Sequence, residues 1–255
     1  MEHEGKYIYC IIGTEQDRDF GPIGVGGRCD KVSTIGADDL AMVISSHPLM
    51  KLVVNRENIL AHEKVIEEVM KEYAVLPVRF CTIASSTDEI RSLLFKRYRE
   101  FKNLLKDMDH KVELGVKGLW KDMDGIFMEI AEENKEIAKI KKRLTRNPGQ
   151  KDMRAKVELG KLVEAALKKK KDGEAERIVA ALNASAFDYK LNNTIGDDMF
   201  INASFLVSKG REKEFDNIME ELSETYKDRM KFLYVGPLPP YNFVNITIYQ
   251  EEWEK

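Results

Sequence analysis

Proton transfer near neutral pH and metal binding both favour histidine, and this chain has four: His3, His47, His62 and His110. None of them lies three or four residues from another histidine or a cysteine, the spacing that puts two ligands on one helix face. His62 and Glu63 could form an acid–base pair, but neighbouring helix residues point about 100° apart. Since His62 also belongs to an apolar stripe, we interpret it as a hydrogen-bonded core or interface histidine. The pattern predicts no metal site and no cofactor.

Other motifs of catalysis and ligand binding are incomplete. The glycine-rich segment 21–27 has the composition of a phosphate-binding loop, but the spacing fails at Cys29 and a strand, not a helix, is expected next. Asp122 to Gly125 resembles part of a calcium loop, yet Ile126 falls where an oxygen ligand belongs. The chain has no Gly-x-Ser-x-Gly motif. We therefore predict no catalytic residue and a protein that is not an enzyme.

Two proline-containing stretches are unusual. Pro77 lies in the apolar run from Val75 to Thr82, and the second stretch contains Pro237, Pro239, Pro240 and Tyr241. Proline has no N–H to donate to a sheet, and its ring fixes φ. Both stretches are therefore expected at sheet edges, at bulges or where a strand ends.

Arg79 is a charge within the first of these runs. Strand alternation places it on the face of Pro77 and Cys81, opposite Leu76 and Val78. A guanidinium there needs a partner, either a glutamate of a neighbouring helix or a group on another protein. By contrast, we interpret the lysines at 168–171 as a solvated helix face.

Composition indicates a globular protein with room for two domains. The 255 residues are 43% hydrophobic and 33% charged, with a formal net charge of -3. No whole-molecule positive field would attract nucleic acid or anionic lipid. The apolar run from Tyr7 to Gly13 is far shorter than the roughly 20 residues that span a bilayer. Three widely spaced cysteines suit reduced thiols. We expect a soluble, cytoplasmic protein.

Periodicity predicts the elements of the first half. Alternation and apolar runs indicate strands at 6–12, 29–35 and 40–45, the last two joined by a hairpin turn at 36–39. Helical spacing indicates a helix over 58–73, followed by a strand over 75–82. Ser86 and Glu89 form a capping box for a second helix that runs to Met108. The order is βββαβα.

The second half restarts with a strand over 112–120 and continues into a helix-forming region, 123–182. Arg146-Asn147-Pro148-Gly149 interrupts this region, which predicts two long antiparallel helices. Strands at 187–191 and 199–207, a helix over 215–226 and strands at 231–235 and 244–248 follow. This pattern predicts an α+β fold of two ferredoxin-like domains with mostly antiparallel sheets, at 1–109 and 110–255. The helical hairpin at about 123–182 is an insertion into the second domain.

Three segments resemble a known family. His62-Glu63-Lys64-Val65 followed by Val75 to Ile83 looks like the H-E-x-V and V-L-P-V-R-F-G-T-V stretch of the GvpF/GvpL gas vesicle proteins. The segment from Gly236 to Val244 is similar to the terminal G-P-W-P-P-Y-S-F-V of that family, and 113–117 resembles its E-x-x-V-K segment. Cys81 stands where the family usually has glycine, and Leu238 where it often has tryptophan.

The resemblance implies a non-enzymatic, cytoplasmic accessory protein of gas vesicle formation, with a place at the gas-facing surface of the vesicle. It implies as partners the hydrophobic shell protein and other accessory proteins, with no nucleic acid and no membrane. It also implies a two-domain α+β fold with a helical element. The candidate partner-binding residues are His62, Pro77, Arg79, Pro237, Pro239, Pro240 and Tyr241.

Two other classes of function remain open from the residues. An RNA-recognition module shares the βαββαβ order and would use aromatic side chains such as Phe200 and Tyr189 on an open sheet face. A haem-dependent or small-molecule enzyme would use His62 or His110 as a ligand or base.

Overall fold

The computed structural model describes residues 4–50, 52–146 and 152–248, which form two compact units. Unit 1 comprises the described residues up to Glu113 together with those from Pro237 onward, and unit 2 runs from Leu114 to Gly236. The sequence patterns predicted a domain boundary near residue 110. The chain passes from unit 1 to unit 2 between Glu113 and Leu114. The residues from Pro237 onward belong by their contacts to unit 1, whereas the predicted domain 110–255 included them in the second.

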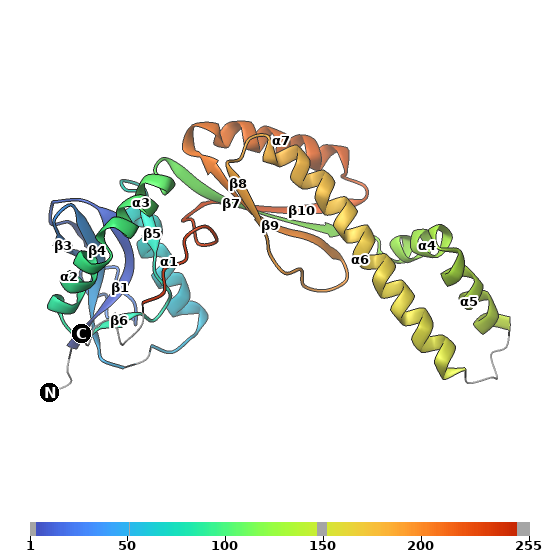
Figure 1. Cartoon of the computed structure of the whole chain (residues 1–255), viewed down its shortest axis with the longest axis horizontal. Helices are drawn as coiled ribbons and strands as arrows, with labels where there is room; N and C mark the ends of the chain where they lie inside the picture. The colour runs from blue at the N-terminus through green and yellow to red at the C-terminus, as the bar shows by residue number, and fades with distance from the viewer. Residues whose placement is uncertain (1–3, 51, 147–151, 249–255) are drawn as a thin grey trace. The chain divides into compact units, whose positions relative to one another are not determined.

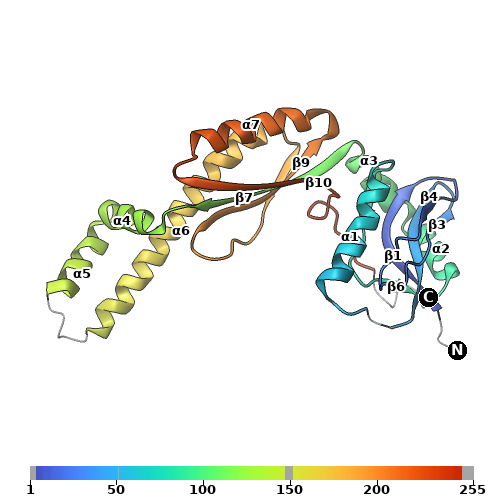
Figure 2. The ribbon, with the colours of Figure 1, turned by 180° about the vertical axis from the view of Figure 1, so that it is seen from behind.

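Unit 1 is built on an antiparallel sheet with the strand order β2-β3-β4-β1-β5, and β6 also pairs with β1. Figures 1 and 2 show α1 on one side of this sheet and α2 and α3 on the other. The central strand, β1, pairs with β4, β5 and β6. It is buried from Tyr7 to Ile12, because helices cover both of its faces. The elements are β1 (Glu4–Gly13), β2 (Asp19–Gly21), β3 (Val32–Ala37), β4 (Leu40–Pro48), α1 (Arg56–Met70), β5 (Val75–Pro77), β6 (Ile83–Ala84), α2 (Thr87–Lys96) and α3 (Tyr98–Met108).

Most of the predicted elements of unit 1 are confirmed, including the β3–β4 hairpin and the Ser86 cap, whose side chain accepts from the Glu89 N–H. The predicted strand 75–82 is wrong beyond Pro77, where β5 ends and a turn follows. The predicted alternation is also wrong, because Val75 to Val78 are all buried. The single second helix is two helices, which meet at Arg97 with φ -107° and ψ 20°.

Unit 2 has a four-stranded sheet with the order β10-β7-β9-β8. Helices α6 and α7 lie against it, and Phe205 of β9 packs its ring on Phe215 of α7 with centroids 5.3 Å apart. The elements are β7 (Lys111–Trp120), α4 (Met123–Glu133), α5 (Lys135–Arg146), α6 (Met153–Asn183), β8 (Asp188–Leu191), β9 (Met199–Ser208), a 3-10 turn (Lys209–Arg211), α7 (Glu212–Thr225) and β10 (Met230–Leu238).

The predicted helical hairpin corresponds to α4, α5 and α6. Figures 1 and 2 show α5 beside the first half of α6. The first helix of the hairpin is divided because Asn134 leaves helical geometry and caps α5, where its side chain accepts from the Glu136 and Ile137 N–H groups. Residues 147–149 of the predicted break lie outside the described residues, and α5 ends at Arg146.

The predicted strand at 244–248 is absent from the structure. These residues form no sheet, although Val244 and Ile246 are buried. Apolar residues alternate here because one side of this irregular segment faces the core of unit 1, to which the segment belongs.

The mixed helix and antiparallel sheet fold is confirmed. Two ferredoxin-like domains are not, since β1 of unit 1 pairs antiparallel with both β4 and β5 and helices lie on both faces of its sheet. No helix within the described ranges is long and apolar enough to cross a bilayer.

Candidate functional site

The motif segments far apart in the sequence meet in unit 1. His62 lies on α1, Val75 and Pro77 on β5, and Tyr241 in the turn that follows β10. Val65, Ile66 and Val69 of α1 join Tyr7 and Tyr9 of β1 in one buried cluster that also contains Val75, and Tyr241 packs against it. We call this cluster with His62 and Tyr241 the motif core.

His62 is held by aromatic side chains of the central strand. Its Nδ1 lies 3.0 Å from the Tyr7 hydroxyl, and its ring stacks on Tyr9 with centroids 5.6 Å apart. The Tyr7 hydroxyl also accepts from the Cys81 N–H at 3.0 Å. Burial lowers the pKa of His62 to about 4, although a hydrogen bond with the Val78 backbone opposes this. The imidazole is therefore neutral at pH 7 and joins α1, β1 and the turn after β5.

The C-terminal segment is attached to the motif core by a buried carboxylate. Glu113 is 2% exposed and accepts from the Asn242 backbone N–H at 2.8 Å and from Asn242 Nδ2 at 2.6 Å. The Tyr241 hydroxyl is buried and has no hydrogen-bond partner within the described residues. Burial and the nearby carboxylate of Glu63 raise the pKa of Tyr241. The phenol stays neutral, and its ring closes one side of the core.

Residues 5–245 match the family model described as gas vesicle synthesis protein GvpL/GvpF. The chain belongs to this family. Membership implies an accessory role in gas vesicle formation, and the resemblance drawn from the motifs is confirmed.

Relatives of the family match over most of their length. The chain is 29% identical to gas vesicle protein F of Streptomyces sp. (strain CB03234) over 87% of this chain and 91% of the relative. It is 27% identical to gas vesicle protein F1 of Halobacterium salinarum over 98% and 97% of the two chains.

Crystal structures of the gas vesicle protein GvpF have the same fold. The protein from Anabaena sp. PCC7120 aligns with a TM-score of 0.79 at 22% identity, covering 96% of this chain and all of that one. The protein from Microcystis aeruginosa aligns with a TM-score of 0.78 at 23% identity, over 95% of this chain and 99% of that one.

The seven candidate residues of the family motifs differ in exposure. His62, Pro77, Pro239 and Pro240 are buried and Tyr241 is half-buried, so a partner protein could reach little of their side chains in this conformation. Arg79 and Pro237 are exposed. Pro77 ends an edge strand and Pro237 lies near the end of β10, another edge strand, which confirms the expectation from their missing N–H groups.

Arg79 has no ion pair with any residue that the structure describes, so the expected salt bridge to a helix glutamate is not formed there. It lies in the turn after β5, where its backbone carbonyl accepts from the Thr82 hydroxyl at 2.7 Å. Cys81 in the same turn has φ 68°, in the left-handed region that favours glycine. Glycine, the residue that the resembling family motif has at this position, adopts that conformation without steric cost.

The residues that the other two classes of function would use differ in exposure. Phe200 is 2% exposed and packs on Trp120, whereas Tyr189 is 38% exposed and packs on Phe205, so the two rings do not form an open pair on one sheet face. His110 is largely exposed at the end of unit 1, whereas His62 is enclosed. Across the described part of the chain, no group of three His, Cys, Asp or Glu side chains could hold a metal ion.

Sequence reasoning missed a buried charge network in unit 2. Glu174 of α6 is 3% exposed; it accepts from the Trp120 indole N–H and from Arg229 at 2.8 Å. Arg229 also binds Glu129 of α4 through two hydrogen bonds of 2.6 and 2.9 Å. Arg229 lowers the pKa of Glu129 to about 2. A carboxylate on the apolar face of α6, beside Ala175 and Ile178, was the available signal.

Proposed function

We propose that the chain is a non-catalytic accessory protein that binds the hydrophobic shell protein and other accessory proteins while gas vesicles nucleate and assemble. Its place of action is the cytoplasm and the gas-facing surface of the vesicle. The observation that supports this best is the family match over residues 5–245, which includes both units. The GvpF relatives and structures support the same assignment.

The edge strand β8 offers a surface that suits a hydrophobic partner. It ends the sheet of unit 2, so no described strand covers its outer edge. Leu191 is 60% exposed and Ile195, in the following loop, is 77% exposed. The Asn192 N–H bonds the Asn202 carbonyl, and antiparallel alternation then directs the Leu191 N–H outward. An edge with an outward N–H and apolar side chains can accept a strand of a shell subunit.

The exposed motif residues provide a second contact. Arg79 and Pro237 remain candidate partner-binding residues, supported by their exposure and, for Arg79, by its lack of an ion pair among the described residues. The buried candidates, His62, Pro77, Pro239, Pro240 and Tyr241, would act by holding these surfaces in place. We also propose a ferredoxin-like assignment for unit 2 alone, supported by the order β10-β7-β9-β8.

Capture of purified shell protein by the immobilised full-length chain tests the proposal. Replacing Leu191→Lys and Ile195→Lys should weaken capture about tenfold or more, because burial of one large apolar side chain contributes about 1.5–3 kcal/mol. The matched control, Leu233→Lys with Val235→Lys on the opposite edge strand β10, should retain capture. No capture by the unaltered chain would reject binding of the shell protein, and equal loss in both variants would reject the β8 edge as its site.

A further inference from the structure

The first half of α6 and the helix α5 form a strongly basic arm. We call α5 with residues 153–171 of α6 the basic arm. From residue 135 to 171 the sequence has fourteen lysines and arginines against four acidic residues, a formal charge of +10. The whole chain carries -3, so the remaining residues carry -13. This separation of charge is much larger than the net charge of the protein indicates.

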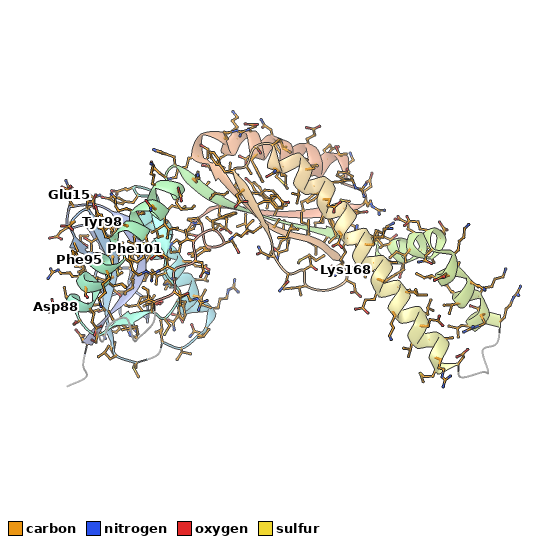
Figure 3. The ribbon with its side chains drawn as sticks, in the orientation of Figure 1. Glu15, Asp88, Phe95, Tyr98, Phe101 and Lys168 are labelled. Carbon is orange, nitrogen blue, oxygen red and sulfur yellow. The ribbon has the colours of Figure 1, made fainter. Side chains whose placement is uncertain are left out.

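The basic side chains point away from the contact between the two helices. Ile137 and Ile140 of α5 are buried, while Lys139, Lys142 and Arg146 follow at helical spacing on the opposite face. On α6, Arg154, Lys161 and Lys168 repeat every seven residues and are exposed, next to Val157, which is 53% exposed. Figure 3 labels Lys168 on α6, where it is joined by side chains that project from the arm.

Most of the charge of the basic arm is unneutralised. Arg143 pairs with Asp152, and Lys170 pairs with Glu129 and Glu133. Lys139, Lys142 and the other basic residues of the two stripes form no ion pair with any side chain in the described ranges. Like charges at this density repel one another along a helix, so a bound negative surface would stabilise the arm.

The complementary surface is α7 of the same unit. Residues 212–225 contain six acidic side chains and one lysine. Phe215 and Met219 are buried against the sheet, and Glu220, Glu221 and Glu224 are exposed on the outer face. Glu224 pairs with Lys227, whereas Glu220 and Glu221 have no ion pair among the described residues. Burial raises the pKa of Glu212, and the neighbouring Asp216 carboxylate adds to the rise.

We infer that the basic arm of one chain binds the outer face of α7 of a second copy, so that chains associate head to tail. The two surfaces lie on different elements of one compact unit, which makes the contact heterologous: each chain keeps one free arm and one free α7 at the ends. Association should depend on salt, since solvent-exposed charges are screened within about 8–10 Å at physiological ionic strength. The inference does not require binding of the shell protein.

Sedimentation of the full-length chain at increasing concentration tests this inference. At low ionic strength the average mass should rise above that of one chain and return to it at about 1 M salt, where screening acts within about 3 Å. Lys139→Glu with Lys142→Glu, or Glu220→Lys with Glu221→Lys, should each weaken association strongly when tested alone, because each pair of substitutions changes the charge of its surface by four. An equimolar mixture of the two variants should restore association of the two chains, because the unaltered arm of one variant can bind the unaltered α7 of the other. Lys64→Glu with Lys106→Glu, two exposed lysines of unit 1, gives the control for net charge.

Four results would overturn the inference: a single-chain mass at every concentration in low salt, association unchanged by either reversal, equal loss in the Lys64 and Lys106 control, or failure of the mixture to reassociate. Polyglutamate, a single-stranded oligonucleotide and anionic lipid vesicles are further probes. If the chain stays monomeric and the arm reversal alone removes binding to one of these, the arm serves that polyanion and not a second copy. Circular dichroism of each variant checks that the helices remain formed.

Discussion

The burial of His62 on α1 keeps its imidazole neutral near pH 7. Its folded pKa is about 4, against 6.5 when unperturbed, so the unfolded chain binds a proton more readily between these values. Stability is therefore complete above about pH 6.5, falls as the pH decreases through this window and levels off below pH 4. The lost stability is roughly 3 kcal/mol, from about 1.4 kcal/mol per pKa unit. Urea unfolding at about pH 7 and pH 4 measures it.

The variant His62→Phe separates this effect from the titration of carboxylates. Phenylalanine keeps a ring against Tyr9 and cannot be protonated, and the Tyr7 hydroxyl still accepts from the Cys81 N–H. The variant should be less stable than the natural chain near pH 7 but should lose less stability on acidification. Equal losses in the two chains would show that His62 is not the group that titrates.

At the scale of elements, the buried network joins α4, α6 and β7. Arg229→Met should lower the unfolding free energy by about 3–5 kcal/mol, because the buried Glu174 carboxylate loses its hydrogen-bonded cation and keeps only Arg177, at 3.8 Å, as a charged neighbour among the described residues. Arg211→Met is the matched control: its partner Glu214 has a side chain 51% exposed, so the cost should be at most about 1 kcal/mol. Denaturant unfolding compares them, and similar losses would contradict the role of the network.

The elements also show what sequence periodicity can and cannot predict. It predicted α1 and α7 because each has one apolar face, and it predicted the β3–β4 hairpin, β7 and β9 from apolar or alternating runs. The helix breaks at Arg97 and Asn134 were missed because the apolar spacing continues across both residues. The segment from Val244 to Ile246 alternates like a strand but finds no strand to pair with.

The sequence predicted the burial of His62 in the motif core but not the residues that His62 and the C-terminal segment contact. The apolar stripe that contains His62 indicated that the side chain is buried. Its partner Tyr7 and the pairing of Glu113 with Asn242 join residues that are far apart in the sequence. Such pairs depend on tertiary contacts that no local pattern records.

For the whole molecule, the important fact is that unit 2 interrupts unit 1 between Glu113 and Pro237. A linker of about six Gly and Ser residues, spanning roughly 20 Å, should replace 114–236 and leave a unit 1 that unfolds cooperatively. A chain that ends at Gly236 should instead lose stability in unit 1, since Tyr241 and Asn242 are missing. Urea unfolding measures the stability of both chains. The loss of stability on acidification that comes from His62 identifies the transition of unit 1. An unchanged unit 1 transition in the shortened chain would contradict this account.

That interruption also sets the order in which the chain can mature on the ribosome. At about 5–20 residues per second, synthesis from Leu114 to Gly236 takes on the order of 6–25 s. Throughout this interval the nascent N-terminal sheet lacks the tyrosine that will later cover it, while the inserted unit is continuous and can fold as it emerges. A holdase chaperone that recognises uncovered apolar surface would therefore meet the part of the protein made first, and release it only after the last residues arrive.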